Sequence, residues 1–171
     1  MENCPMPCCV IADSEDPRRR RFADLLVRLG FEVLEARCGA DIRYHARTQD
    51  FHVLFVQSWL KDGAGAQAID AFRDAYPSQG AHVVLLAEEV TEKLIRDALA
   101  AGADDYLADA FDADQLLFKI DLAAEQGRVP GWMTALEAER QGEAVGQGNA
   151  GMSGTVTQGQ AASAKPDLRL C

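Results

Sequence analysis

Thiols are the most reactive side chains in this sequence, and they could form disulfides or bind a soft metal ion. The five cysteines include no CxxC pair, and no histidine lies at metal-ligand spacing from them. An odd total also argues against a disulfide framework, and the three cysteines near the N-terminus would need a fourth ligand to bind zinc. We therefore expect free thiols and no metal site at Cys4, Cys8, Cys9, Cys38 and Cys171.

Carboxylates are the second group with possible chemistry. Asp13, Glu15, Glu88 and Asp109 lie at or just after the ends of short apolar runs. If those runs are neighbouring parallel strands, the carboxylates meet at one edge of a sheet and could attract a cation. The alternative, which we favour, is that they are solvated loop side chains.

The runs that would position these groups alternate with longer amphipathic stretches, which is typical of βα units with a parallel sheet covered on both faces. Three runs are almost continuously apolar, as central strands require, whereas residues 31–36 alternate and fit a strand with one wetter face. We expect an α/β fold with a doubly wound, five-stranded parallel sheet. The predicted strands are 8–13, 31–36, 52–57, 82–87 and 104–108.

Helix signals lie between the predicted strands. Asp16, Thr91 and Asp112 are suited to accept hydrogen bonds from the first turns of three helices. Two further helices are predicted over 40–47 and 66–76. Four consecutive arginines, Arg18 to Arg21, follow Asp16, and we interpret them as a solvated helix start rather than a binding patch.

The length of 171 residues and the 48% apolar composition fit one globular domain with some extra chain. We assign residues 1–7 to an N-terminal extension, 8–126 to the domain and 127–171 to a flexible tail. The last segment is rich in glycine and small polar residues and has too few large apolar residues to order itself. A short helix is predicted near 132–140.

Charge and hydropathy exclude several classes of partner. The net charge of -10 repels phosphate backbones, so we expect no nucleic-acid partner. The sequence has no apolar run long enough to span a bilayer and no export signal at its start. We expect a cytoplasmic protein with no membrane contact.

Three segments carry a family resemblance: residues 10–17 (VIADSEDP), 30–33 (GFEV) and 102–107 (GADDYL) followed by Phe111. In this order and spacing, on five βα units, they resemble the receiver domains of bacterial two-component response regulators. The resemblance covers residues 8–126. It implies the flavodoxin-like receiver fold and a role in phosphorelay signal transduction.

Receivers of this family accept a phosphoryl group on an aspartate at the end of the third strand. The reaction uses a carboxylate pair that holds Mg²⁺, a hydroxyl after the fourth strand and a lysine after the fifth. The resemblance places Gln57 at the acceptor position, and an amide cannot form an acyl phosphate. The other positions carry Asp13 and Ser14 for the metal pair, Ala87 for the hydroxyl and Asp109 for the lysine.

The resemblance therefore implies a degenerate pseudo-receiver, which is no enzyme and has no cofactor. Mg²⁺ binding should be weak or absent, with Asp13 the only remaining candidate ligand. We expect the carboxylate of Asp109 to repel its acidic neighbours by about 4 kcal/mol at about 4 Å and an effective dielectric of about 20.

We then expect the protein to signal by contact with another protein. Tyr106 matches the family's switch aromatic, and it belongs to the face formed by the fourth helix, the last strand and the last helix, where a homodimer could form. Gly65 matches the turn glycine after the third strand, and Trp59 is a candidate contact anchor. We expect a histidine kinase, a phosphotransfer protein or another regulator as partner.

Two alternatives belong to other functional classes. The protein could still be phosphorylated on a displaced carboxylate, with Asp62 the nearest candidate. It could instead be a small-molecule-binding flavodoxin-like domain, but residues 14–16 are anionic and offer no glycine-rich phosphate cradle.

Overall fold

Strands and helices alternate along the part of the chain that the structure describes, residues 6–130 and 132. In this computed structural model, the five main strands are β1 (Cys8–Ala12), β2 (Glu32–Ala36), β3 (Val53–Gln57), β6 (His82–Ala87) and β7 (Asp105–Ala108). The helices are α1 (Asp16–Arg28), α2 (Gly39–Thr48), α3 (Gly65–Ala75), α4 (Glu92–Ala100) and α5 (Ala113–Glu125). A small antiparallel hairpin consists of β4 (Trp59–Leu60) and β5 (Gly63–Ala64).

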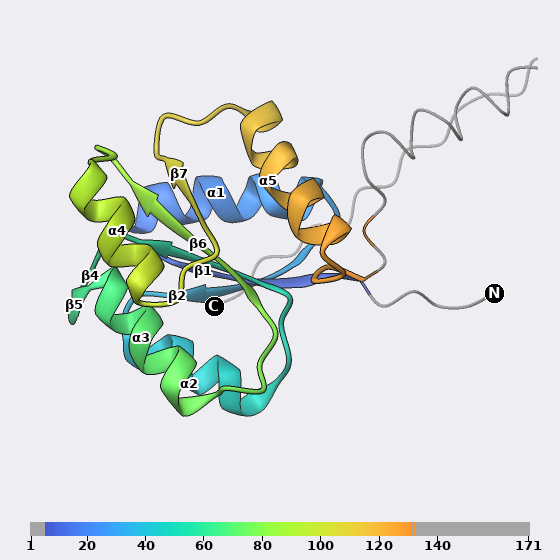
Figure 1. Ribbon diagram of the computed structural model, residues 1–171. Coiled ribbons are helices and arrows are strands. Elements are labelled where there is room, and N and C mark those ends of the chain that lie inside the picture. Colours follow the sequence, from blue (N-terminus) through green and yellow to red (C-terminus); the bar gives the residue numbers. More distant parts are fainter. Residues whose placement is uncertain (1–5, 131, 133–171) are drawn as a thin grey trace, which may run out of the picture.

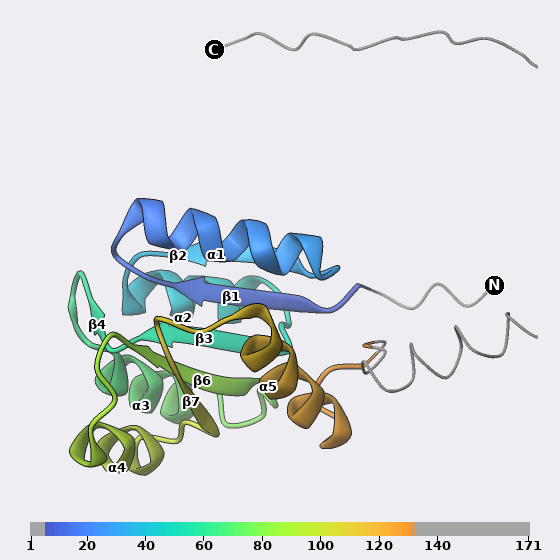
Figure 2. The same ribbon diagram turned by 90° about the horizontal axis from the view of Figure 1, so that it is seen from above.

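The main strands form one parallel sheet in the order β2-β1-β3-β6-β7. Helices α1 and α5 cover one face of the sheet, and α2, α3 and α4 cover the other (Figures 1 and 2). The predicted doubly wound five-stranded fold is therefore confirmed. The five main strands point the same way, so their carboxyl ends meet at one edge of the sheet.

Two apolar layers stabilise this arrangement. Alternate residues of the central strands face opposite sides, as the pleat requires. Val10 packs with Phe72 in the layer under α2, α3 and α4, whereas Ile11 packs with Leu26 and Ile120 under α1 and α5. The sheet is thus packed on both faces.

Buried thiols form part of that core. Cys8 and Cys9 lie in β1, and burial raises the pKa of both. Cys8, Cys9 and Cys38 are free, as predicted, whereas Cys4 and Cys171 lie outside the described residues. No group of three or more candidate ligands in the described part of the chain could hold a metal ion.

Polar residues cap two helices as the sequence predicted. Thr91 accepts a hydrogen bond from the Leu94 amide, and Asp112 forms a capping box at the start of α5. The start of α1 differs, because Glu15 is the N-cap and Asp16 lies inside the helix. The Asp16 carboxylate accepts a hydrogen bond from the Arg19 guanidinium instead of capping the backbone.

The hairpin between β3 and α3 was not predicted. Leu60 anchors it in the core, while Trp59 is 68% exposed. Gly65 closes it, because a β-carbon at this position would collide with the carbonyl oxygen of Gln57. A two-residue strand carries no periodicity, which is why the sequence pattern missed the hairpin.

The predicted tail begins inside structure that packs on the domain. Val129 is only 3% exposed, and the Trp132 ring lies 5.0 Å from the Phe31 ring. The Trp132 indole nitrogen also donates a hydrogen bond to Asp121 over 2.8 Å. Residues 1–5, 131 and 133–171, including most of the predicted helix near 132–140, lie outside the described residues.

Among the described residues, no helix combines the length and apolar character needed to cross a bilayer.

Candidate functional site

The candidate site lies at the carboxyl ends of β1, β3, β6 and β7, which are adjacent in the sheet. Open α/β sheets place their functional groups at this edge. The structure brings together Asp13 after β1, Gln57 at the end of β3 and Asp109 after β7. Backbone hydrogen bonds hold the first and last of these, from the Asp13 amide to Ala36 over 3.0 Å and from the Asp109 amide to Ala87 over 2.8 Å.

Gln57 is buried, and both ends of its amide have partners. Its nitrogen donates a hydrogen bond to Asp109 Oδ2 over 2.7 Å. Its oxygen accepts a hydrogen bond from the Ser58 amide over 3.1 Å. The side chain is 3% exposed and is therefore a fixed structural group at the end of β3.

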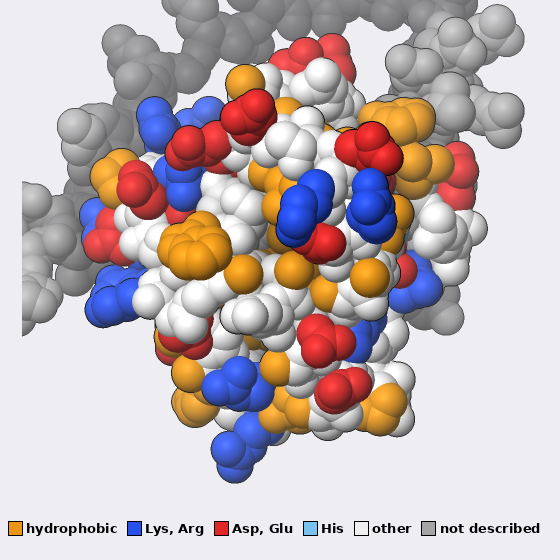
Figure 3. Space-filling view, turned by 60° about the vertical axis from the view of Figure 1, so that its left-hand side comes forward, with side chains coloured by type: hydrophobic (Ala, Val, Ile, Leu, Met, Phe, Trp, Pro, Cys, Tyr) orange, Lys and Arg blue, Asp and Glu red, His pale blue; other side chains and the backbone are white. Residues whose placement is uncertain are grey.

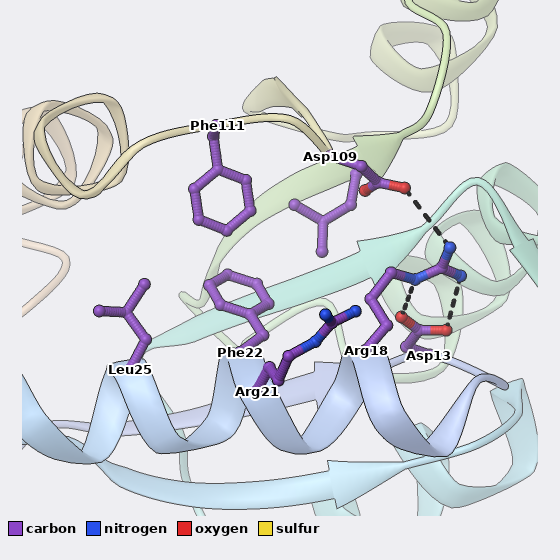
Figure 4. A pocket seen from close by; sticks show the side chains of 8 residues that line it. Asp13, Arg18, Arg21, Phe22, Leu25, Asp109 and Phe111 are labelled. Atoms are coloured by element: carbon purple, nitrogen blue, oxygen red, sulfur yellow. Dashed lines mark hydrogen bonds and ion pairs between the residues drawn. The ribbon is translucent and has the colours of Figure 1, made fainter.

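Arg18 occupies the space between the strand ends (Figure 4). Its guanidinium donates to both oxygens of Asp13, with 2.9 Å between Nη2 and Oδ1. The remaining nitrogen, Nη1, lies 3.0 Å from the Glu88 carboxylate and 3.6 Å from Asp109 Oδ2. Hydrogen bonding to Asp13 raises the pKa of Arg18 above its usual range.

Our interpretation of the four arginines as a solvated helix start was wrong for two of them. Arg18 has a side chain 27% exposed, and Arg19 one that is 2% exposed. Arg19 donates to the Asp13 carbonyl oxygen over 2.8 Å and to the Glu35 carboxylate over 2.7 Å. The first turn of α1 lies beside the ends of β1 and β2, which supply these acceptors.

Asp109 lies between groups with opposing effects. Burial raises the pKa of its carboxyl group, while the hydrogen bond from Gln57 and the charge of Arg18 lower it. Repulsion from Asp13 and Glu88 adds to the increase, in the direction expected from the sequence. Arg18 offsets this repulsion, so the acidic edge is partly neutralised from within.

Comparison with known proteins gives the family. A family model described as the response regulator receiver domain matches residues 9–121. The chain belongs to this family. It is a receiver domain of two-component signalling, a signalling module rather than a classical enzyme.

Individual relatives of this receiver are distant. Protein PetR of Rhodobacter capsulatus is 27% identical over 135 residues, which cover 79% of this chain and 55% of PetR, so the chain spans about half of that relative. A CheY-like receiver from Methanospirillum hungatei superposes with a TM-score of 0.66 at 20% identity, covering 72% of this chain and 98% of the other. The receiver of an HD domain-containing protein from Pseudomonas fluorescens gives 0.65 at 23% identity, covering 71% and 97%.

The side chains at this edge of the receiver do not fit Mg²⁺. The ion requires several free oxygen ligands in octahedral geometry. Arg18 engages both carboxylate oxygens of Asp13, and the Glu15 amide also donates to Oδ1 over 2.8 Å. The amide oxygen of Gln57 is bonded to Ser58, and Ser14 offers only an exposed hydroxyl.

The other predicted positions are also placed. Ala87 is buried at the end of β6 and has no polar side-chain atom. Ser14, Gln57 and Trp59 line an open cavity of about 460 Å³ together with Glu88 and other residues. Figure 3 turns this end of the sheet forward and shows acidic and basic side chains beside each other, not one continuous acidic surface.

Asp62 lies apart from the strand-end groups. Its carboxylate accepts a hydrogen bond from the Gly39 amide over 2.9 Å and so ties the hairpin to the start of α2. It lines a separate small cavity with Gly39 and Arg43. The structure therefore does not bring Asp62 together with Asp13 and Asp109.

Tyr106 is on β7, on the face bounded by α4 and α5. The residue is 38% exposed, and the Lys119 ammonium lies 5.4 Å from the centre of its ring. Lys119 also pairs with Asp105 over 2.7 Å. Arg18 was not among the predicted site residues, because nothing in the run of four arginines distinguishes it from its exposed neighbours.

Proposed function

We propose that this receiver signals without phosphorylation, as an interaction module that binds a histidine kinase, a phosphotransfer protein or another regulator. Receiver domains interact with proteins of two-component systems, so a protein partner follows from the family. The proposal assigns Gln57 to the acceptor position at the end of β3. Its buried amide, bonded to Asp109 and Ser58, is the observation that carries the proposal.

The groups around Gln57 support the same conclusion. Phosphoryl transfer depends on cationic and hydrogen-bonding groups placed at the transferred oxygens. Asp109 adds negative charge at the position that the resemblance assigns to a lysine, and Ala87 has no hydroxyl. The neighbouring Arg18 is committed to Asp13 and Glu88.

Two surfaces are available for partners. Trp59 is a largely exposed aromatic side chain on a hairpin whose next residue, Leu60, is buried. Exposed aromatic residues on a rigid support are common anchors of protein interfaces. The second surface is the α4-β7-α5 face, whose three elements each carry an exposed large apolar residue, Leu99 on α4, Tyr106 on β7 and Phe118 on α5, and it is our candidate for a homodimer.

Phosphorylation is the direct test. The protein is incubated with acetyl phosphate and MgCl₂, and its intact mass is measured beside a receiver with an acceptor aspartate as positive control. We expect no added phosphoryl group and, in affinity capture from the native cell, partners that do not depend on acetyl phosphate. A phosphoryl adduct on this chain, mapped to Asp62 or any other carboxylate, would overturn the proposal.

A further inference from the structure

Arg18 links helix α1 to the ends of three strands. From the first turn of α1 it contacts Asp13 after β1, Glu88 after β6 and Asp109 after β7. We propose that Arg18 is a built-in cation that takes the place of a divalent metal ion and holds these strand ends in one fixed arrangement. This inference deepens the proposed function, on which it rests, by identifying what sets the conformation of the receiver.

The charges at the site require a cation there. The Asp13 side chain is 2% exposed and that of Asp109 is 15% exposed. A buried carboxylate without a counter-charge is strongly destabilising, so these groups need a positive partner inside the fold. Arg18 is the cation that contacts both.

The shape of the guanidinium suits this position. A planar fork can bind one carboxylate with two parallel hydrogen bonds, and Arg18 does so with Asp13. Its Nη1 atom then faces Glu88 and Asp109 on the other side. One side chain thus forms hydrogen bonds with two carboxylates and an ion pair with a third, whereas a lysine ammonium has no planar fork with which to bind Asp13 in this way.

Arg21 supplies an internal comparison. It lies one helical turn after Arg18 on the same side of α1, and both line a cavity of about 330 Å³ with Phe22 and Leu25. Figure 4 marks the contacts of Arg18 with Asp13 and Asp109 but none for Arg21. Arg21 is exposed, and among the described residues no ion pair includes it. The two arginines share chemistry and helix, but only Arg18 reaches the strand ends.

A fixed internal cation makes the conformation independent of metal supply. The loops after β6 and β7 carry Glu88 and Asp109, so Arg18 restrains both loops without any ligand from solution. The free receiver should therefore adopt the same arrangement with Mg²⁺ and without it.

The test compares thermal unfolding of the full chain as wild type, Arg18→Ala and Arg21→Ala, each in EDTA and in excess MgCl₂. We expect no change of the wild-type Tm with MgCl₂. Arg18→Ala should lower Tm by at least about 4 °C, whereas Arg21→Ala should change it by less than about 2 °C. Amide resonances of Glu88 and Asp109 should move in Arg18→Ala and stay in place when MgCl₂ is added to wild type.

Arg18→Lys keeps the charge without the fork and serves if the alanine variant does not fold. Its Tm should also lie below that of Arg21→Ala. Equal Tm values for the Arg18 and Arg21 variants, or a wild-type Tm raised by MgCl₂, would overturn the inference. A phosphoryl adduct on wild type would instead overturn the proposed function, whatever the Arg18 variants show.

Discussion

Gln57 and Asp109 form a hydrogen bond of 2.7 Å that crosses the end of β6, which lies between β3 and β7 in the sheet. In register, Gln57 is opposite Leu86 and Ala108 is opposite Ala87. Ala87 is the last residue of β6, the strand that this hydrogen bond crosses. A neutral amide at position 57 is what makes the contact with the Asp109 carboxylate favourable.

Gln57→Asp reverses that relationship. Two carboxylates about 4 Å apart repel by about 4 kcal/mol at an effective dielectric of about 20, so we expect a free energy of unfolding lower by up to this amount at pH 7. The loss should shrink near pH 4, because protonation of either group removes the repulsion. Urea unfolding at both pH values measures it, with Gln57→Asn as the neutral control.

The same Gln57→Asp variant tests how far the surrounding groups have diverged. On the proposed function we expect no acyl phosphate after incubation with acetyl phosphate and MgCl₂, because Asp13 remains bound to Arg18 and neither Ala87 nor Asp109 supplies a hydroxyl or a cation. Its detection by intact mass would show that position 57 was the only obstacle.

The burial of His82 should make the stability of the protein depend on pH near neutrality. It is buried at the start of β6, and neither ring nitrogen has a hydrogen-bond partner among the described residues. Burial lowers its pKa from 6.5, an effect that nearby Asp104 opposes and Arg128 reinforces. Below pH 6.5 the unfolded chain therefore binds this proton more readily than the folded chain, so the free energy of unfolding should fall as the pH falls.

The measurement is chemical unfolding between pH 8 and pH 5, for wild type and for His82→Phe, which keeps a planar ring and has no titrating group. The variant should show a shallower decline than wild type over this range. Identical slopes would mean that His82 titrates alike in both states.

Substitution of Gly65 tests the close approach between the hairpin and the end of β3. A β-carbon at this position meets the Gln57 carbonyl, so Gly65→Ala should lower the free energy of unfolding by about 1–3 kcal/mol and disturb the end of β3. Gly80→Ala is the matched control, because a β-carbon there meets nothing within 4 Å. Thermal unfolding of both variants checks the difference, and two equally stable variants would contradict the close approach.

The segment after α5 tests the extent of the domain. A chain ending at Gln126 loses Val129 from the core and the contact of Trp132 with Phe31, whereas a chain ending at Trp132 keeps both. Burial of one large apolar side chain contributes about 1.5–3 kcal/mol, so the shorter form should be less stable by about that much. Equal unfolding midpoints for the two forms would place the boundary of the domain before Val129.

The fold followed from the sequence because its strands carry strong local patterns. Nearly continuous apolar runs such as 82–87 have to be buried on both faces, and caps such as Asp112 mark where helices begin. Asp13 and Gln57 could be placed at one edge for the same reason, since a parallel sheet brings the ends of its strands together.

What the sequence did not reveal depends on contacts between distant segments. Arg18 and Arg19 look like exposed charges until the ends of strands distant in the sequence supply their partners, after β1, β6 and β7 for Arg18 and at β1 and β2 for Arg19. Val129 lies in a segment of small and polar residues, so composition hid its burial. The hairpin with Trp59 is too short for any periodic pattern.

The exposed hairpin also gives the protein an optical property. The chain contains two tryptophans, the exposed Trp59 on β4 and Trp132, which packs on Phe31. Figure 2 shows that β4 and the segment that follows α5 lie at opposite ends of the sheet. Indole fluorescence shifts to shorter wavelength when water is excluded, so docking on the hairpin should move the emission of Trp59 alone. Loosening of the segment after α5 should instead red-shift the emission of Trp132. The two intrinsic fluorophores should therefore report separately on docking at the hairpin and on the packing of the segment after α5.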